Sequence, residues 1–211
     1  MRLAIVGCGY VADYYVATLA NHHGLELAGV FDRDLERARQ FSKYHGIRRY
    51  GSLDEVVGDP GVEIVANLTN PRSHFEVSNV ILQAGKHVYS EKPLATSLPE
   101  AERLVELADS RGLLIGSAPC TVLGESAQTV WKALRARRIG TPRLVYAEMD
   151  DGPTPLKNHG TWRSASGAPW PAKDEFEVGC TLEHAGYYLT WLTTFFGPAR
   201  TVTSFAHVLL P

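Results

Sequence analysis

The chain has 211 residues, of which 45% are hydrophobic and 21% charged, and its formal net charge at pH 7 is −2. These values fit a globular protein of one or two domains and exclude disorder, collagen-like repeats and coiled coil as its main character. No stretch approaches the roughly 18 apolar residues of a membrane span, and no long basic run suits nucleic acid, so we expect neither membrane nor nucleic acid among its partners.

Strand and helix signals alternate over the first 120 residues. Short apolar runs are typical of buried parallel strands, and the amphipathic stretches between them are typical of helices. The predicted strands are 3–6, 25–31, 62–68, 86–90 and 113–117. The predicted helices are 11–22, 35–44, a short one after residue 52, 72–84 and 98–111. Such alternation implies right-handed crossovers and a doubly wound parallel sheet, an α/β fold.

Two serines predict where helices begin. Ser52 and Ser97 each stand three residues before a glutamate, Glu55 and Glu100, which is the spacing of a capping box. Gly85 follows the helix predicted over 72–84 and favours its end there.

The pattern changes after Pro119. We predict helices over 125–138 and 179–196 and strands over 143–149 and 201–210. Residues 150–174 are rich in Gly, Pro and Ser without periodicity, and a structureless stretch of that length is usually functional or mobile.

The second region looks unfinished. A two-stranded sheet is marginal by itself, and the sequence stops on the apolar residues 208–211. We therefore divide the chain into a dinucleotide-binding domain, 1–120, and a partial α+β domain, 121–211, and expect a fragment of a longer protein. The alternative is a compact protein whose edge a partner subunit covers.

The first chemical motif is Gly7-Cys8-Gly9-Tyr10-Val11-Ala12, which follows a strand and opens a helix. Gly7 allows the tight turn, Gly9 lets the backbone approach a pyrophosphate, and Ala12 permits close packing of helix on strand. The helix N-terminus adds free N–H groups for phosphate. The motif predicts dinucleotide binding, and the alternative is a plain turn between strand and helix.

Asp32 ends the second predicted strand, 25 residues after Gly7, where an acid can hydrogen-bond the adenosine ribose. It favours NAD, because a 2′-phosphate would face a carboxylate. Arg33 keeps NADP possible, since a guanidinium can accept that phosphate. The alternative for residues 32–34 is a solvated turn in which Asp34 caps a helix.

The second motif is Gly-Lys-His-Val-Tyr-Ser-Glu-Lys-Pro over residues 85–93, a strand that ends at the carboxyl edge of the sheet, where ligands bind. Together with residues 7–12, Thr69-Asn70-Pro71 followed by His74, residues 140–142 and residues 177–197, it resembles the Gfo/Idh/MocA family of NAD(P)-dependent sugar and cyclitol oxidoreductases. The resemblance covers nearly the whole chain. It implies a Rossmann domain followed by a larger domain with an open, mostly antiparallel sheet, and members are usually much longer.

The resemblance also implies roles for single residues. Lys92 would point at nicotinamide and substrate, where it can stabilise a developing alkoxide, and the alternative is a surface charge. The remaining cofactor-binding candidates are Thr69, Asn70, His74, Glu91, Trp162 and Arg163. For the last two, a loop anchored by one tryptophan is the alternative.

The family's usual catalytic pair is an Asp at the position of His184 and a His at the position of Tyr188. This sequence departs at both places, although His184, Tyr188 and Trp191 share one helix face. Either His184 is the proton acceptor with Tyr188 as its hydroxyl partner, or the usual base is gone and the protein carries out a variant reaction or none. A buried helix with a core histidine is the further alternative.

The sequence thus predicts an enzyme that transfers a hydride between nicotinamide and a hydroxyl of a sugar, cyclitol or nucleotide sugar. A non-catalytic dinucleotide-binding module or truncated remnant is one alternative, and redox-assisted glycoside cleavage or isomerisation is another. We expect a small carbohydrate-type substrate, a homo-oligomer for the full-length protein and a cytoplasmic location. Cys8, Cys120 and Cys180 are too few and too far apart to suggest a disulfide framework or a metal site.

Overall fold

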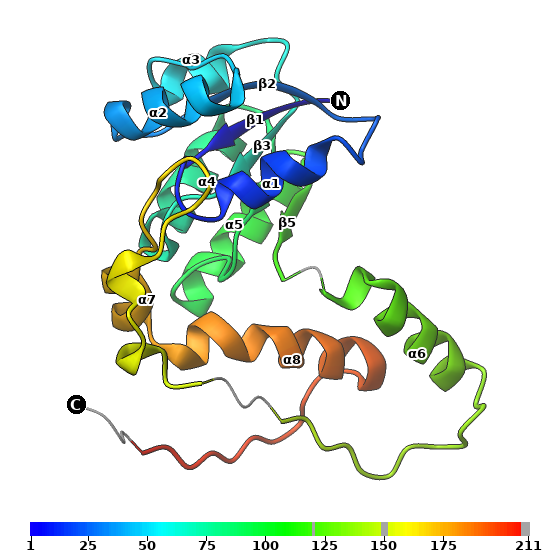
Figure 1. The fold of residues 1–211 in the computed structure, drawn as a ribbon. Coiled ribbons are helices and arrows are strands. Elements are labelled where there is room, and N and C mark those ends of the chain that lie inside the picture. Colours follow the sequence, from blue (N-terminus) through cyan, green and yellow to red (C-terminus); the bar gives the residue numbers. More distant parts are fainter. Residues whose placement is uncertain (120, 149–151, 208–211) are drawn as a thin grey trace.

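A computed structural model describes residues 1–119, 121–148 and 152–207. Its first half is a parallel sheet with helices on both faces (Figure 1). The strands are β1 (Arg2–Val6), β2 (Glu26–Phe31), β3 (Ile64–Asn67), β4 (His87–Ser90) and β5 (Ile115–Ser117), in the spatial order β2-β1-β3-β4-β5. The predicted doubly wound parallel sheet is confirmed.

A single bridge extends this sheet beyond β2. Val30 pairs in parallel with Arg49 on the side away from β1. Counted as a strand, Arg49 gives the order 3-2-1-4-5-6, which is the order of the Rossmann fold. Successive strands are added on one side of β1 up to Arg49 and on its other side from β3 onward. Ligands of such folds bind in the crevice between β1 and β3, where the order reverses.

Successive side chains of a strand point to opposite faces of the sheet, and here both sets are apolar, so helices cover both faces. Ala4 and Val6 belong to the core on one face of β1, and Leu3 and Ile5 belong to the core on the other. Helices α1 (Ala12–Leu19) and α2 (Leu35–His45) pack on the Leu3 face. Helices α3 (Leu53–Gly58), α4 (His74–Gln83) and α5 (Leu98–Ser110) pack on the Ala4 face. The strands are therefore apolar almost throughout.

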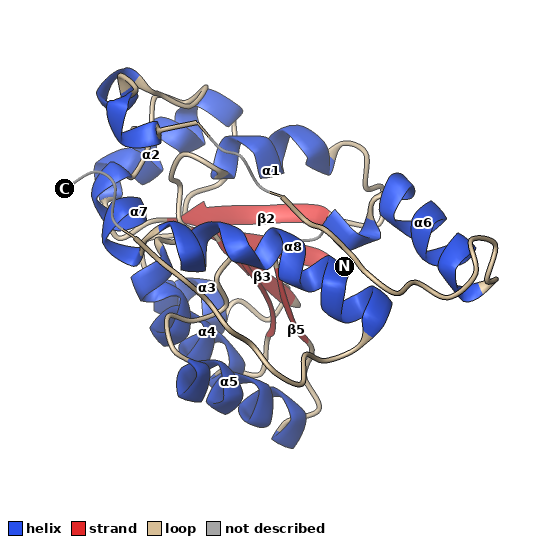
Figure 2. Cartoon of the chain, turned by 90° about the horizontal axis from the view of Figure 1, so that it is seen from below, coloured by secondary structure: helices blue, strands red, loops and turns tan. Residues whose placement is uncertain are grey.

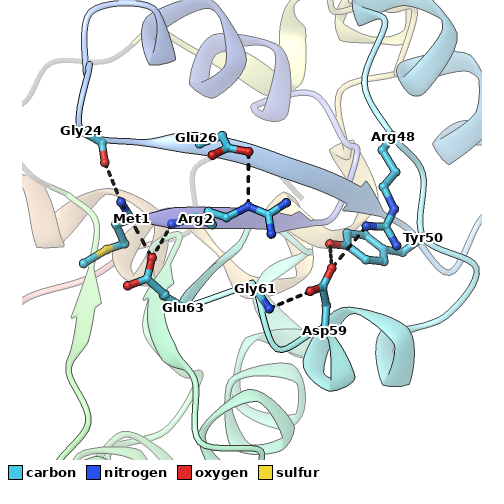
Figure 3. Close-up of polar contacts among 9 residues, drawn as sticks. All are labelled: Met1, Arg2, Gly24, Glu26, Arg48, Tyr50, Asp59, Gly61 and Glu63. Atoms are coloured by element: carbon cyan, nitrogen blue, oxygen red, sulfur yellow. Dashed lines mark hydrogen bonds and ion pairs between the residues drawn. The ribbon is translucent and has the colours of Figure 1, made fainter.

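Polar contacts fix the start of β1, far from the carboxyl edge (Figure 3). The Met1 ammonium donates to the carbonyl of Gly24 at 2.9 Å, and the Arg2 N–H donates to Glu63 at 2.7 Å. A second set in the same view is centred on Asp59, which accepts from the hydroxyl of Tyr50 at 2.8 Å. These contacts hold the turn before β3 and leave the opposite edge for ligands.

Of the two predicted capping boxes, the one at Ser52 forms in part, since the Glu55 side chain accepts from the N–H of Gly51 at 2.6 Å rather than from that of Ser52. The Ser52 side chain accepts from the N–H of Glu55 at 3.1 Å and begins α3. Ser97 occupies the N-cap of α5 without a side-chain capping bond. Glu100 instead accepts from the Thr96 hydroxyl at 3.4 Å, so the reciprocal pairing is lost there.

The second half of the described chain is helical. It contains the short 3₁₀ helices η2 (Thr121–Leu123), η3 (Thr154–Leu156) and η4 (His159–Thr161) and the helices α6 (Glu125–Arg135), α7 (Ala172–Val178) and α8 (Cys180–Phe196). Residues 152–174, the described part of the stretch without periodicity, are thus partly ordered into short helices. Figure 2 shows β2 pointing toward α7, with α8 crossing beside the sheet. No helix of the described part is long and apolar enough to cross a membrane.

The strands predicted over 143–149 and 201–210 are wrong for residues 143–148 and 201–207, which form no sheet. Residues 149 and 208–210 lie outside the described part. A strand needs a neighbour for its N–H and C=O groups, and no described segment lies alongside these two in a ladder. The expected antiparallel sheet is accordingly absent from the described residues after β5, where the antiparallel pairing consists of one bridge between Arg163 and Pro169.

Candidate functional site

Two adjoining hollows lie at the carboxyl edge of the sheet. The first has a volume of about 340 Å³ and the second about 60 Å³, and both are lined by Gly9, Leu68, Thr69 and Asn70. Because they share these residues, they form one crevice. It lies where the segments after β1 and β3 turn to opposite faces of the sheet. The first hollow is also lined by Gly7, Asp32, Arg33, Arg37, Leu53 and Val77. The second is also lined by Tyr10, Val11, His74, Glu91, Lys92, Trp170 and Glu175.

The glycine turn has the geometry that its sequence predicts. Gly7 has φ +100°, and a Cβ there would lie 2.5 Å from the carbonyl of Leu68. A Cβ on Gly9 would meet nothing within 4 Å, so open space lies above the turn. Ala12 is fully buried where α1 begins. These residues form a cradle that fits a pyrophosphate at a helix N-terminus.

Asp32 and its neighbours border the first hollow. Asp32 is 5% exposed, and its carboxylate accepts from the backbone N–H groups of Cys8 and Asp34, both at 2.8 Å. It also lies 3.6 Å from the guanidinium of Arg37. Asp34 caps α2 by accepting from the N–H of Arg37 at 3.1 Å. Arg33 is exposed at the rim, so a carboxylate and a guanidinium both reach the place where the sequence predicts the adenosine ribose.

His74 links two of the loops that line the crevice. Its ring nitrogens lie 2.6 Å from the carbonyl oxygen of Pro93 and 2.8 Å from that of Thr69. The side chain is fully buried, and this burial lowers the pKa of His74. A neutral imidazole can donate to only one of the two carbonyls. The position suits a residue that holds the Thr69 loop against the turn after Lys92.

Lys92 forms an ion pair with Glu183 at the start of α8. Their side chains are 19% and 2% exposed. Burial disfavours the charge of Lys92, but Glu183 outweighs this effect and raises the pKa of Lys92. Glu91, the preceding residue, accepts from the hydroxyl of Tyr15 at 2.6 Å and from the N–H of Lys92 at 3.0 Å. The ammonium is therefore held charged and oriented at the crevice.

Helix α8 presents Glu183 and Tyr187 to Lys92, in place of the predicted His184 and Tyr188. Burial raises the pKa of Tyr187, and the nearby Lys92 charge opposes that rise. Tyr188 instead lines a separate apolar hollow of about 580 Å³ between α6 and α8. The His184 ring lies 6.3 Å from that of Tyr187. Each residue of the predicted pair follows Glu183 or Tyr187 by one position, which on a helix is about 100° of rotation.

Trp162 and Arg163 do not line either hollow of the crevice. Trp162 packs against Trp170 with 5.2 Å between ring centroids, and Arg163 is exposed and donates to the carbonyl of Trp162. Trp170 lies closer to the predicted nicotinamide end, where it lines the second hollow. The loop thus supplies an aromatic side chain as expected, but a different one.

The sequence analysis missed Glu175 as well as Trp170. Glu175 lines the second hollow beside Lys92, and burial together with the carboxylate of Glu183 raises its pKa to about 7. No periodic pattern surrounds Trp170 or Glu175 in the sequence. The packing of α7 against α8 brings Glu175 to the crevice, and the contacts of the loop before α7 bring Trp170 there.

Asp13, in the first turn of α1, fastens the loop before Trp170 to the sheet domain. It accepts from the hydroxyl of Ser166 at 2.8 Å and lies 2.6 Å from Nε2 of His45. Burial favours the neutral acid, but hydrogen bonds from Ser164, His45 and Ser166 outweigh this effect and lower the pKa of Asp13.

A metal has no evident site in the described part of the chain, which contains no suitable group of three His, Cys, Asp or Glu residues. Cys8 and Cys180 are free thiols, and Cys120 lies outside the described residues. The crevice instead has the parts that a dinucleotide needs. These are a phosphate cradle, a carboxylate and a guanidinium at the predicted ribose position, and a charged lysine at the far end.

Comparisons with known proteins agree with this geometry. Residues 1–118 match the model of an oxidoreductase family with an NAD-binding Rossmann fold. A trans-1,2-dihydrobenzene-1,2-diol dehydrogenase from Macaca fascicularis is 31% identical over 171 residues, which cover 80% of this chain and 51% of that protein. A UDP-N-acetylglucosamine 3-dehydrogenase from Acidithiobacillus ferrooxidans is 30% identical over 70% of this chain and 45% of its own length.

The solved structures agree as well. The WlbA dehydrogenase from Bordetella pertussis, in complex with NADH and UDP-GlcNAcA, superposes with a TM-score of 0.61 at 27% identity. The match covers 66% of this chain and 43% of that one. The chain spans about half the length of the curated relatives it matches.

Proposed function

Because the chain belongs to the Gfo/Idh/MocA family of oxidoreductases, we propose that it transfers a hydride between a nicotinamide cofactor and a hydroxyl-bearing carbon of a sugar, cyclitol or nucleotide sugar. The observation that carries the proposal is the position of Lys92, held charged by Glu183 at the end of the crevice that begins at the glycine turn. The relatives named for diols and UDP-sugars support a substrate with neighbouring hydroxyls. Activity and substrate of the whole protein are part of this proposal, as is the division into domains 1–120 and 121–211.

The described residues fit the cofactor. The turn over 7–12 would hold the pyrophosphate, and Asp32 with Arg33 would contact the adenosine ribose. Thr69 and Asn70 line both hollows and would lie along the middle of the dinucleotide. When bound, the nicotinamide ring supplies the hydride acceptor or donor. We propose NAD as the cofactor and NADP as its alternative, since acid and base both border the first hollow.

Lys92 and Tyr187 would then act on the substrate oxygen. The Lys92 ammonium can donate a hydrogen bond to that oxygen and stabilise the negative charge that develops as the hydroxyl proton leaves. Tyr187 has a raised pKa and is a phenol at neutral pH, so its hydroxyl can donate a hydrogen bond to the same oxygen. Glu183 holds Lys92 in place, and His74 joins the loops on which Thr69 and Lys92 stand.

Calorimetric titration of the chain with NADH and then NADPH tests the proposal. Turnover is then followed by the absorbance of reduced nicotinamide, using UDP-sugars, cyclitols and trans-diols. Saturable binding with turnover of any of these supports the proposed reaction. Binding without turnover supports the non-catalytic module, and glycoside cleavage without net change in absorbance supports the redox-assisted alternative. Absence of binding to either cofactor contradicts the proposal.

A further inference from the structure

A second carboxyl group stands beside the Lys92–Glu183 ion pair. We propose that Glu175 is a proton-exchange residue of the crevice, which shares a proton with Glu183 and passes protons between Lys92 and water. The sharing of the proton rests on the placement and the charges of these three groups, whereas its use in hydride transfer rests on the proposed function.

One oxygen of the buried Glu183 carboxylate lacks a hydrogen-bond donor in the part of the chain that the structure describes. One oxygen, Oε2, contacts Lys92. The other, Oε1, is buried and has no hydrogen-bond partner among the described residues. Such an oxygen is costly to bury. The Glu175 carboxyl lies within hydrogen-bonding reach of Glu183. A proton on Glu175 would therefore give the Glu183 carboxylate a second donor beside Lys92.

The balance of charge favours that proton. Lys92 is the ammonium that faces both carboxyl groups. Arg72, on 3₁₀ helix η1 (Pro71–Ser73) against α7, pairs with Glu177. The other titratable groups that act on this cluster are Glu91 after β4, Tyr187 on α8 and the buried His74 on α4. Burial disfavours the charge of Glu175, and two carboxylates beside one ammonium would also repel each other, so the pKa of Glu175 is raised to about 7.

The positions of the two acids suggest a route for the proton. Glu183 is 2% exposed, whereas Glu175 is only partly buried and lines the second hollow. When an alcohol is oxidised, the hydride leaves carbon with both electrons for nicotinamide, and the hydroxyl proton enters the protein. Lys92 takes this proton as it gives one of its own to the Glu183–Glu175 pair, and Glu175 then releases a proton to water. Reduction of a carbonyl runs the same steps backward.

Carbon-13 NMR of protein labelled at glutamate Cδ tests the sharing without any turnover. We expect one glutamate of the purified chain to titrate near neutral pH, the signal to vanish in Glu175→Gln, and the signal to remain in Glu177→Gln. Glu177→Gln is the control, because it removes a carboxylate of the same helix α7 that pairs with Arg72 and not with Glu183. Titration of every glutamate in the ordinary acidic range overturns the inference, and this wild-type result requires no variant to fold.

The pH dependence of kcat/KM tests the use of the proton once a substrate is found. Glu175→Gln can still donate a hydrogen bond to Glu183 but cannot ionise, so the inflection near neutral pH should disappear. A purely structural role would alter stability and leave the inflection in place, which contradicts the proton-exchange role. If no substrate turns over but the neutral glutamate is found, the proposed function fails and the shared proton stands.

Discussion

The ammonium of Lys92 lies against the carboxylate of Glu183, which is 91 residues further along the chain. This ion pair joins the carboxyl edge of the parallel sheet to helix α8. Because both groups are largely buried, each depends on the other for its charge. The pair therefore serves the fold and the proposed chemistry together.

Lys92→Met should abolish turnover and also destabilise the protein, by about 3–5 kcal/mol, because it leaves the Glu183 carboxylate buried without its cation. The double variant Lys92→Met/Glu183→Gln removes both charges and should recover most of that stability without recovering activity. Chemical denaturation and the nicotinamide assay measure the two effects. Equal stability of the single and double variants would contradict a buried, mutually dependent pair.

Tyr187→Phe and Tyr188→Phe are a matched pair that tests which face of α8 serves the reaction. Removal of the Tyr187 hydroxyl should lower kcat by roughly 10²- to 10³-fold, the usual cost of losing one hydrogen-bond donor to an oxygen on which negative charge develops. Tyr188 lines the apolar hollow between α6 and α8, so Tyr188→Phe should leave kcat nearly unchanged. The reverse order of effects would restore the pair His184 and Tyr188 that the sequence suggested.

Local signals predicted the sheet domain well. Its strands are apolar runs between glycine turns, and its helices follow caps and amphipathic periods, so each element is specified by its own residues. The strands predicted over 143–149 and 201–210 failed in their described parts because a strand depends on a neighbour, which local sequence does not supply.

The site was predicted in part for the same physical reason. Gly7, Asp32 and Lys92 stand at ends of strands, and parallel strands bring such ends to one edge. Glu175 reaches the crevice through the packing of α7 on α8, and Trp170 through the loop that Asp13 fastens, contacts that local sequence does not specify. On α8 the sequence favoured His184 and Tyr188, whereas Glu183 and Tyr187 lie near Lys92, because neighbouring helix positions point in directions about 100° apart.

Asp32→Ala should weaken the glycine turn as well as cofactor binding. The N–H of Cys8 donates to Asp32 in a buried setting, and loss of the acceptor should cost about 1–3 kcal/mol of folding free energy. Glu36→Gln, on the exposed face of α2, is a control for the loss of one negative charge. Urea denaturation and NADH titration measure both effects, and an unchanged midpoint for Asp32→Ala would show that the turn does not depend on this carboxylate.

Arg33→Ala should separate the two cofactors. Arg33 is exposed at the rim of the first hollow, where it can meet a 2′-phosphate, whereas Arg37 lies against Asp32 and Asp34. A hydrogen bond to a charged group contributes about 1.5–3 kcal/mol, so NADPH affinity should fall roughly 10- to 100-fold while NADH affinity stays near its original value. Calorimetry measures both. An equal loss of affinity for the two cofactors would contradict this prediction and show that Arg33 contacts a group other than the 2′-phosphate.

Acid should release the loop that carries Trp170 before the sheet domain unfolds. The pKa of Asp13 is lowered in the folded protein, so its contribution to docking is fully present above the unfolded value of about 3.9 and is lost as the pH falls through the folded value. Fluorescence of Trp162 and Trp170, which flank Ser166, reports the change. Asp13→Asn should show the released signal already at neutral pH and bind NADH more weakly, because Trp170 lines the second hollow. Asp109→Asn, exposed on α5, should behave as the unaltered chain does, and an identical acid transition in Asp13→Asn would show that another group holds the loop.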